Sequence, residues 1–516
     1  MTSTSRYWVG EYSEGLAIGD LDNDGNPDLA VVGRTGSSHD GGDYVAVLLN
    51  PNGTGQFMYP HQSLTGGTGR NDPVSLSRAF FDGDAYPDVA TLDWVNDSVL
   101  VYLGDGAGHF TSCFRWPVAN APCEIVAADV DGQPGADLII GHGDASAANI
   151  SVLLSVGGGN FNLPATYPAG LKPMGIFVGE LNNAGLPDIA TANYTAGNIA
   201  VLINQGLGVF NGVVSYYAAG SLPNHSAIDG GDFNNDLSID LVTPNPGSNC
   251  VRVYWNDGSG GFGGSVDVAS GLLYDPYQVC VDDLDGNGYA DIIVGSYDTT
   301  EVAVILSSGS GFAAPSFYHA GEEQYEVRTS DFDSDGNIDI VVLNTESYSF
   351  TVLFGDGAGN FSVGGHYGIV SDDSEGLAVA DFDNDGYPDV AVSNYNHDNI
   401  SVMLNRYIIL TDVDGPGSAN QVLPKRFVLQ QNYPNPFNPR TTIRYSLPAR
   451  ADVRITVYNL LGQRVKEFDE GAKPAGEHSV IWDGRTDGGS LVATGVYFYR
   501  LYAGDFTESR KMLLVK

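Results

Sequence analysis

Basic residues are scarce in this chain. Its 516 residues include 23 Lys and Arg against 63 Asp and Glu, which gives a formal net charge of −40. Nucleic-acid-binding proteins carry a basic surface, so this composition argues against a nucleic-acid partner. Hydrophobic residues make up 42% of the chain, enough to bury a core, and this excludes a disordered acidic tail.

Long apolar runs and cysteines are also few. No stretch of 18 or more apolar residues occurs, so we predict no transmembrane segment. The first residues contain no charged segment followed by an apolar one, so no secretory signal peptide is visible. Four cysteines are too few for a disulfide scaffold. Cys113 and Cys123 flank one loop and either form a disulfide or remain, like Cys250 and Cys280, free thiols.

An acidic segment recurs eight times, starting at residues 20, 80, 129, 180, 232, 283, 331 and 381. The fullest copies read DLDNDGNPDLAVV, DFDSDGNIDIVVL and DFDNDGYPDVAVS. In each unit an apolar run precedes the acidic loop, two more follow it, and a Gly-rich turn with Phe leads to a fourth short segment. Four short strands in about 50 residues favour a β-propeller blade. The rival is a stacked solenoid, whose units of this length are usually helical.

The two ends of the repeat region complement each other. Eight acidic loops are present but only seven Gly-Phe segments follow them, at Phe57, Phe110, Phe161, Phe210, Phe262, Phe312 and Phe361. The opening segment SRYWVGEYS resembles FSVGGHYG, the fourth strand that precedes the last unit. We therefore expect an all-β, eight-bladed propeller over residues 1–405, closed by the N-terminal strand, with seven blades as the alternative.

The loop pattern D-x-D-x-D-G-x-x-D suits a hard cation. Side-chain oxygens at positions 1, 3, 5 and 9 and a backbone carbonyl at position 7 can converge on Ca²⁺, which takes six to eight oxygen ligands. Mg²⁺ fits less well because it demands a tight octahedron. An EF-hand would need Glu at position 12, where Val31, Val342 and Val392 stand. The alternative is that Asp, Asn and Gly only mark turns.

The copies differ in their donor sets. Five are predicted to bind Ca²⁺, with these candidate ligands: Asp20, Asp22, Asp24, Asn26 and Asp28; Asp232, Asn234, Asp236, Ser238 and Asp240; Asp283, Asp285, Asn287, Tyr289 and Asp291; Asp331, Asp333, Asp335, Asn337 and Asp339; Asp381, Asp383, Asp385, Tyr387 and Asp389. Asp129, Asp131, Gln133 and Asp137 form a weaker set. The copy with Asp82, Asp84 and Asp88 has Phe80 at its first position. In the copy with Glu180, Asn182, Ala184 and Asp188 we expect no ion.

These loops resemble FG-GAP or VCBS-type repeats, known from the integrin α-subunit propeller and many bacterial surface proteins. The resemblance covers about residues 1–405. It implies a propeller with mainly structural Ca²⁺ between the first two strands of each blade and partners docking on the opposite face. The family includes adhesins and lectins, and its folds also occur in polysaccharide lyases.

Aromatic side chains occur in the polar turns between the second and third strands: Trp94, Tyr194, Tyr297 and Tyr395, with His397 beside the last. Aromatic faces among amides and carboxylates suit a sugar or a peptide, although the same residues can simply pack at blade tips. If the propeller geometry holds, these turns lie on the face away from the ions. No H-E-x-x-H or G-x-S-x-G motif occurs, so we assign no catalytic residue.

The last part of the chain is a different module. Residues 425–516 hold 14 Lys and Arg and 9 Asp and Glu, against 9 and 54 in residues 1–424. This reversal marks a separate domain after a linker at 406–424. Strand-like segments such as TTIRYSL, DVRITVYNL and GVYFYRLYAG predict a small Ig-like β-sandwich.

The segment FVLQQNYPNPFNPRTTIRYSLP, continued by VYNLLGQRV, WDGRTDGGSLVATGVYFYRL and KMLLVK, resembles the type A sorting domain of the type IX secretion system. The resemblance spans about residues 427–516. It implies export by that machinery and a secreted or outer-membrane surface location. Such proteins also need a signal peptide, so we expect a truncated N-terminus or a misplaced start.

These observations favour a secreted or cell-surface, calcium-stabilised binding or adhesion protein with a glycan or protein ligand. The alternatives are a lyase-like, polysaccharide-degrading enzyme on a calcium-binding propeller and a purely structural surface protein. An enzyme is less favoured because a lyase needs a base and a charge-neutralising group, and residues 1–424 contain only 9 Lys and Arg.

Overall fold

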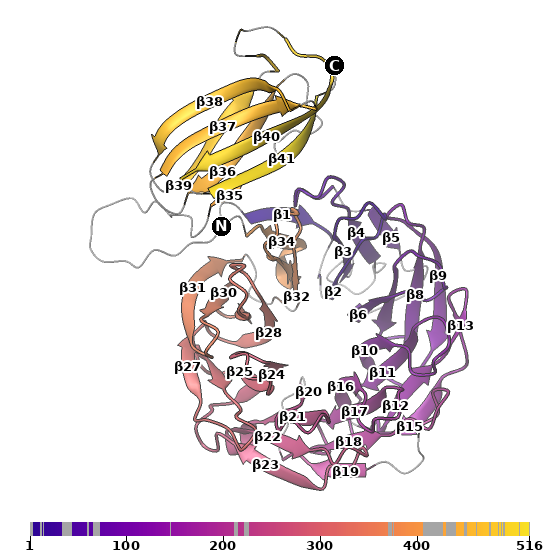
Figure 1. The fold of residues 1–516 in the computed structure, drawn as a ribbon. Helices are drawn as coiled ribbons and strands as arrows, with labels where there is room; N and C mark the ends of the chain where they lie inside the picture. The colour runs from indigo at the N-terminus through magenta and orange to yellow at the C-terminus, as the bar shows by residue number, and fades with distance from the viewer. Residues whose placement is uncertain are drawn as a thin grey trace. The chain divides into compact units, whose positions relative to one another are not determined.

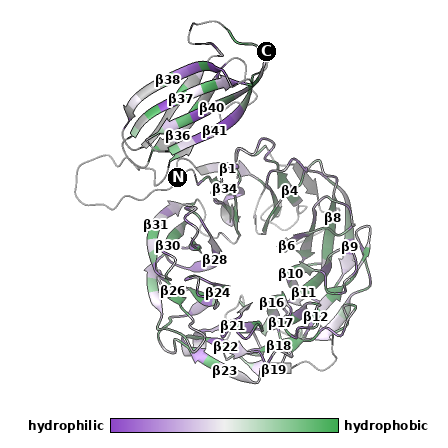
Figure 2. Ribbon diagram, viewed as in Figure 1, coloured by the Kyte–Doolittle hydropathy of each residue, from purple (hydrophilic) through white to green (hydrophobic). Residues whose placement is uncertain are grey.

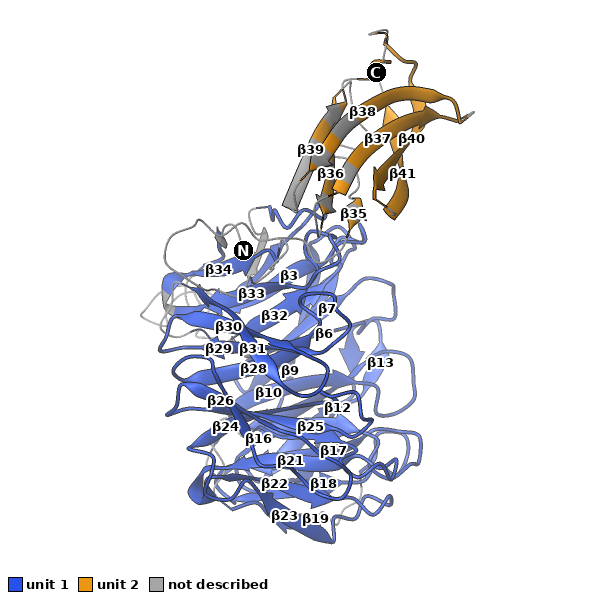
Figure 3. Cartoon of the chain, turned by 60° about the vertical axis from the view of Figure 1, so that its left-hand side comes forward, with its two compact units in different colours: residues 1–406 blue, residues 407–516 orange. Residues whose placement is uncertain are grey.

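The structure is a computed structural model. It describes residues 4–10, 13, 15–33, 44–58, 61–64, 73–144, 146–210, 215–220, 227–369, 374, 376–405, 427–429, 440–447, 451–460, 462–473, 476–482, 484–486, 488, 491–504 and 506–514. The chain divides into two compact units, residues 1–406 and 407–516 (Figure 3). The predicted linker at 406–424 lies outside the described residues.

The predicted all-β class is confirmed. Apart from the 3-10 helices η1 (Pro246–Ser248) and η2 (Tyr395–His397), every regular element among the described residues is a strand. The described part of unit 1 contains eight four-stranded antiparallel sheets, which lie around a ring in Figure 1. The first strand of each sheet is next to the middle of the ring.

Seven sheets follow chain order from the innermost strand outward, and the eighth takes its outer strand from the N-terminus. Their strands are β2 (Leu16–Gly19), β3 (Asp28–Gly33), β4 (Tyr44–Leu48) and β5 (His61–Leu64); β6 (Pro73–Ala79), β7 (Asp88–Asp93), β8 (Ser98–Gly104) and β9 (Phe110–Pro117); β10 (Pro122–Ala128), β11 (Asp137–His142), β12 (Asn149–Leu153) and β15 (Ala165–Pro168); β16 (Pro173–Gly179), β17 (Asp188–Asn193), β18 (Asn198–Leu202) and β19 (Ser215–Ala218); β20 (Asp229–Gly231), β21 (Asp240–Asn245), β22 (Cys250–Trp255) and β23 (Gly264–Val268); β24 (Pro276–Asp282), β25 (Asp291–Ser296), β26 (Glu301–Ile305) and β27 (Ser316–His319); β28 (Gln324–Ser330), β29 (Asp339–Asn344), β30 (Ser349–Gly355) and β31 (Phe361–Gly368); and β32 (Leu377–Ala380), β33 (Asp389–Asn394), β34 (Asn399–Met403) and β1 (Thr4–Trp8). A small hairpin, β13 (Ser155–Gly157) with β14 (Asn160–Phe161), is added in the third sheet's connection.

Burial explains why the second strands read as continuous apolar runs. Every residue of β3, β11 and β25 is buried, because both faces of each sheet are covered by the neighbouring sheets. The third strand β8 is mostly hydrophobic along its length (Figure 2). The outer strand β9 instead alternates between partly buried and exposed residues, as expected for a strand with one face in solvent.

The N-terminal strand completes the last sheet by hydrogen bonding. β1 pairs antiparallel with β34, from Thr4 opposite Met403 to Trp8 opposite Asn399. This sheet shares a hydrophobic cluster with the first one, in which Leu29 and Val31 pack with Ala391 and other residues of the last sheet. The first and last repeats of unit 1 therefore lie side by side.

Neighbouring sheets are joined by one side chain at the end of the third strand. The amide of Asn204 donates to the backbone carbonyl of Val130 in the preceding sheet at 2.7 Å, and Asn256 donates to Leu181 at 2.8 Å. Asn50 makes the same bond to Phe382, at 2.6 Å, between the first and last sheets. Each bond satisfies a buried carbonyl and fixes the distance between two sheets.

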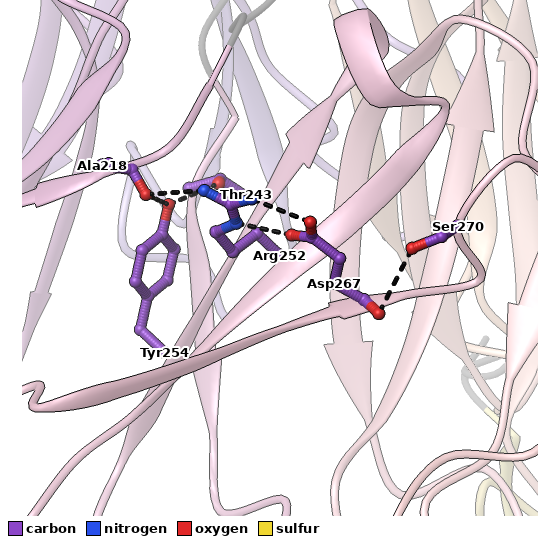
Figure 4. Close-up of polar contacts among 6 residues, drawn as sticks. All are labelled: Ala218, Thr243, Arg252, Tyr254, Asp267 and Ser270. Atoms are coloured by element: carbon purple, nitrogen blue, oxygen red, sulfur yellow. Dashed lines mark hydrogen bonds and ion pairs between the residues drawn. The ribbon is translucent and has the colours of Figure 1, made fainter.

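An ion pair adds to one of these interfaces near the outer edge of the ring. Arg252 on β22 pairs with Asp267 on β23, and its Nη1 donates to the carbonyl of Ala218 on the neighbouring β19 at 3.0 Å (Figure 4). The hydroxyl of Tyr254 donates to the same carbonyl at 3.4 Å. The arginine thus connects two sheets as well as two strands.

Unit 2 is a sandwich of two sheets. One contains β35 (Val428–Leu429), β36 (Thr441–Leu447) and β39 (Gly476–Trp482); the other contains β38 (Arg464–Lys473), β37 (Ala451–Asn459), β40 (Gly495–Ala503) and β41 (Phe506–Leu514). Their inner faces share one core, which includes Tyr445 and Trp482 from the first sheet and Ile455, Tyr499 and Met512 from the second. Inward-facing apolar residues alternate with outward-facing residues along these strands, which lets the two sheets pack face to face.

Candidate functional site

The acidic loops connect the first and second strands of the sheets and share one backbone scaffold. In the first loop, Asp20 accepts hydrogen bonds from the backbone N–H groups of Asp24 and Gly25 at 2.9 and 3.0 Å. Asp22 accepts from Asp24 at 3.2 Å, and Asp24 accepts from Asn26 at 2.8 Å. Each acidic side chain therefore folds back over its own loop, and the carboxylates gather on one side of it.

Five loops bring three carboxylates together. Their oxygen atoms lie within 4.8 Å of one another in the sets Asp20, Asp22 and Asp28; Asp129, Asp131 and Asp137; Asp283, Asp285 and Asp291; Asp331, Asp333 and Asp339; and Asp381, Asp383 and Asp385. The second of these was predicted as a weaker set. The loop at 232–240 has the same hydrogen bonds to Asp232, but Asn234 supplies an amide oxygen at its third position.

The loop without the acids at positions 3 and 5 keeps this conformation. Glu180 accepts from the N–H groups of Ala184 and Gly185, as Asp20 does from Asp24 and Gly25. In this loop the scaffold is therefore held by hydrogen bonds from backbone N–H groups to the carboxylate at position 1. The additional carboxylates of the other loops are not needed to form it.

The aspartate at position 9 opens the second strand and is fully buried in all eight copies, at Asp28, Asp88, Asp137, Asp188, Asp240, Asp291, Asp339 and Asp389. In the first copy, Oδ2 of Asp28 accepts from Leu21 N at 2.8 Å and Oδ1 from Asn50 N at 2.7 Å. The same two bonds recur at Asp188, from Leu181 and Asn204. This residue ties the loop to the end of the third strand whether or not the other acids are present.

Burial has a strong effect on these carboxyls. It raises the pKa of Asp28 and Asp339 to about 7, with the nearby Asp22 and Asp333 adding to the rise. Burial, followed by the charge of Asp383, raises the pKa of Asp389 to about 8. These groups are held in a setting where a negative charge is costly unless a cation compensates it.

The donor sets fit a hard divalent cation. All the donors are oxygens, the carboxylates are close enough to share one ion, and Ca²⁺ accepts an irregular set of six to eight such ligands.

The aromatic turns lie at the opposite end of the second strands from the acidic loops, as the strand order requires. Trp94 and Tyr395 line a cavity of about 870 Å³ at the middle of the ring. Tyr194 lies beneath Lys172, whose Nζ is 4.5 Å from the ring centre. Tyr297 instead packs on Tyr277, with ring centres 5.4 Å apart. The predicted residues therefore do not form one site, and His397 is exposed away from the cavity.

Sequence reasoning missed the residues that line this cavity. The position 13 residues before each ninth-position aspartate lies on or just before the first strand, and all eight of these residues face the cavity: Gly15, Ser75, Glu124, Gly175, Ala227, Gln278, Glu326 and Gly376. Tyr325 lines it too. The constant offset from the acidic loop was a usable signal, because register is fixed between the first two strands of every unit.

The four cysteines are free thiols, so the Cys113–Cys123 disulfide that the sequence left open is not formed. Burial raises the pKa of Cys123 to about 12, which leaves its thiol protonated and unreactive at neutral pH. Among the described residues, no helix has the length and hydropathy to cross a membrane.

Three family models match parts of the chain. The FG-GAP-like repeat matches residues 232–294 and 331–392, the FG-GAP repeat matches 375–422, and the FlgD Ig-like domain matches 438–505. FG-GAP repeats are typical of extracellular proteins. None of the curated proteins searched matches this sequence.

Several solved structures are similar in fold. The propeller of Dos1 is 11% identical and covers 78% of this chain and 95% of its own, with a TM-score of 0.51. A lectin from Agrocybe aegerita, described as recognising non-reducing terminal N-acetylglucosamine, is 17% identical and covers 74% of this chain and 99% of its own, with a TM-score of 0.43. The chain is thus a β-propeller protein with FG-GAP repeats and an FlgD Ig-like domain near its C-terminus.

Proposed function

We propose that unit 1 is an eight-bladed propeller closed by its own N-terminal strand. The eight four-stranded sheets and the pairing of β1 with β34 support this count and this closure. The bond from Asn50 to the carbonyl of Phe382 and the contact of Phe57 with Phe382, ring centres 5.4 Å apart, support it at the junction. A closed ring leaves no exposed sheet edge for aggregation.

We infer that the acidic loops bind Ca²⁺ and that the ions stabilise the blades. The observation that carries this inference is the recurrence of oxygen clusters, within 4.8 Å, at the same strand offset in five loops. When bound, the ion would be held by the carboxylates at positions 1, 3, 5 and 9 and would neutralise their repulsion. The ninth-position aspartate connects each loop to the third strand, so ion binding would stabilise the whole inner hairpin.

We propose that the protein works outside the cell as a binding or adhesion protein for a glycan or a protein. FG-GAP repeats, typical of extracellular proteins, support this location. The face opposite the acidic loops supplies Trp94 and Tyr395 to the lining of the central cavity. Aromatic side chains with polar neighbours suit sugars and peptides. No nucleic acid or membrane span forms part of the proposal.

We propose further that unit 2 directs export through the type IX secretion system. The FlgD Ig-like match and the two-sheet sandwich support a small, folded, separate domain, as a folded sorting signal requires. The test is to fuse residues 425–516 to a reporter behind a signal peptide, in a bacterium with that system. The reporter should reach the medium or the cell surface. Periplasmic retention, with the same reporter lacking these residues as control, would refute this route.

Thermal unfolding with and without calcium tests the calcium proposal. At free Ca²⁺ ten times the dissociation constant, each site adds about 1.4 kcal/mol. Five independent sites would add about 7 kcal/mol. We expect EDTA to lower the melting temperature markedly and Mg²⁺ to restore it poorly. An unchanged melting curve in EDTA would refute calcium stabilisation.

A glycan array with and without calcium then tests for a ligand.

A further inference from the structure

The central cavity contains a carboxylate that no described residue contacts through a hydrogen bond or a close ion pair; the nearest compensating charge is that of Arg328, which is already paired with Glu326. Glu124, on the innermost strand β10, is enclosed by the surrounding sheets and lines the cavity. It makes no hydrogen bond or ion pair with any described residue. The carboxyls that share the cavity differ: Glu326 pairs with Arg328 at 2.5 Å and accepts from Leu377 N at 2.8 Å, and Asp229 accepts from Val281 N at 2.9 Å.

The two glutamates occupy equivalent positions on opposite walls. Glu124 pairs in register with Gly141, and Glu326 pairs with Leu343, each 13 residues before a ninth-position aspartate. Their strands, β10 and β28, are separated by three sheets in either direction around the ring (Figure 1). Of the other six equivalent positions, Gln278 has the longest side chain and the rest are Gly, Ala or Ser. Most of these positions therefore leave the centre of the cavity open, and Arg328 on β28 lies in the same lining and interacts electrostatically with both glutamates.

The charge of this cavity favours a cation. Its lining contains three carboxylates, Glu124, Asp229 and Glu326, and one basic residue, Arg328. Burial raises the pKa of Glu124 to about 7; the charge of Arg328 opposes this rise and that of Glu326 adds to it. Glu124 and Glu326 are not part of any described carboxylate cluster tight enough to share a metal ion. The carboxylates are spread over the walls rather than gathered in a cage, so an organic cation fits better than a divalent metal.

The lining of the cavity also contains apolar and aromatic side chains. Ile125, Ile176 and Val279 line the cavity, and Trp94, Tyr325 and Tyr395 belong to the same lining. Aliphatic walls suit a hydrocarbon body, and aromatic faces attract a cation. The volume, about 870 Å³, lies within the range of small-molecule sites.

We propose that the central cavity binds a primary alkylammonium group, with Glu124 as its counter-ion. The group comes either from a free aliphatic amine or from a lysine side chain of a peptide. This inference rests on the proposed binding role of the face that carries the aromatic turns. It is independent of the proposed calcium sites, whose loops lie at the opposite end of the second strands.

Calorimetry on the full chain, in calcium and 0.15 M salt, tests the proposal. The probes are 1,6-diaminohexane, the uncharged 1,6-hexanediol, and a lysine tripeptide blocked at both ends. We expect one site for the diamine and none for the diol. Salt at this strength screens weak attraction to the acidic surface. Binding of the diamine alone identifies a free amine as the ligand, and binding of the tripeptide as well identifies a lysine side chain.

Two variants and a control locate the site. Glu124→Gln should weaken diamine binding at least about tenfold, as expected for loss of a charged partner. Gln278→Glu adds a carboxylate at an equivalent position and should tighten binding. Glu301→Gln, at an exposed residue of β26, should change nothing. Equal binding by Glu124→Gln and the wild type, equal binding of the diol, or no amine binding to folded protein would each overturn the proposal. A protein that binds a glycan but no amine would refute this inference alone.

Discussion

Substitution of the ninth-position aspartate separates its backbone role from its proposed metal role. Asp28 and Asp188 make the same two anchoring bonds, to N–H groups of the loop and of the residue after the third strand. Only Asp28 belongs to a carboxylate cluster. Asp28→Asn and Asp188→Asn are therefore matched variants, one in a loop predicted to bind Ca²⁺ and one in a loop predicted not to.

The expected magnitudes follow from these contacts. Asn keeps one carbonyl oxygen, so one buried N–H loses its acceptor, which costs about 1–3 kcal/mol in either variant. Asp28→Asn also removes a proposed ligand. With free Ca²⁺ at ten times the dissociation constant, loss of that site lowers the free energy of unfolding by a further ~1.4 kcal/mol. For a unit of this length, 1 kcal/mol corresponds to about 1 °C in melting temperature.

Melting curves at pH 8, in calcium and in EDTA, measure both effects. In EDTA the two variants should be destabilised by similar amounts. In calcium the gain in melting temperature should be smaller for Asp28→Asn than for the wild type and unchanged for Asp188→Asn. If calcium raises the melting temperature of both variants as much as that of the wild type, or if both variants lose the same part of this rise, the carboxylate clusters do not determine ion binding.

Three other outcomes are expected. Leu237 has φ 69° and is 82% exposed, at a position where five of the other seven loops have Gly. Leu237→Gly should therefore relieve left-handed strain and stabilise unit 1 by about 0.5–1 kcal/mol in chemical denaturation. Asn204→Ala should cost about 2 kcal/mol in the same assay, because the amide donates to the carbonyls of both Val130 and Pro187. The pKa of Asp389 is raised to about 8, above its unfolded value, so its protonated form favours folding and that stability is lost as pH rises toward 8. Lowering the pH from 8 to 6 should therefore raise the melting temperature in EDTA. The rise in melting temperature on adding calcium should be smaller at pH 6, because protons compete with the ion. The same change of melting temperature with pH in EDTA and in calcium would contradict this.

The sequence predicted the strand content because each unit repeats the same alternation of apolar runs and turns. Second strands such as DLAVVG could be recognised because burial on both faces favours apolar residues at successive positions. The ends of the chain were informative too, since SRYWVGEYS could be matched to FSVGGHYG, and β1 pairs with β34 as that match requires.

Other features depend on contacts between distant residues and could not be read locally. The amide of Asn256 is 75 residues from its acceptor, Leu181, so its role in joining sheets emerges only from the ring. Tyr297 was grouped with Trp94 from its turn position, but it packs on Tyr277 rather than lining the cavity. The fate of Cys113 and Cys123 likewise depended on their placement in the sheets.

Comparison of the eight loops separates the residues that hold the loop conformation from the acidic residues that are proposed to bind an ion. Every copy keeps the buried ninth-position aspartate, including the copies with Phe80 or Glu180 at the first position. Because Glu180 reproduces the backbone bonds of Asp20, the loop can fold without a full set of acids. The carboxylates at positions 3 and 5 add mutual repulsion, which the hydrogen bonds from backbone N–H groups, such as that from Asp24 to Asp22, oppose only in part. A bound cation would offset this repulsion, which gives a physical reason for the acids at these positions. The loops that lack these acids provide the comparison, since they should fold in the same way without binding an ion.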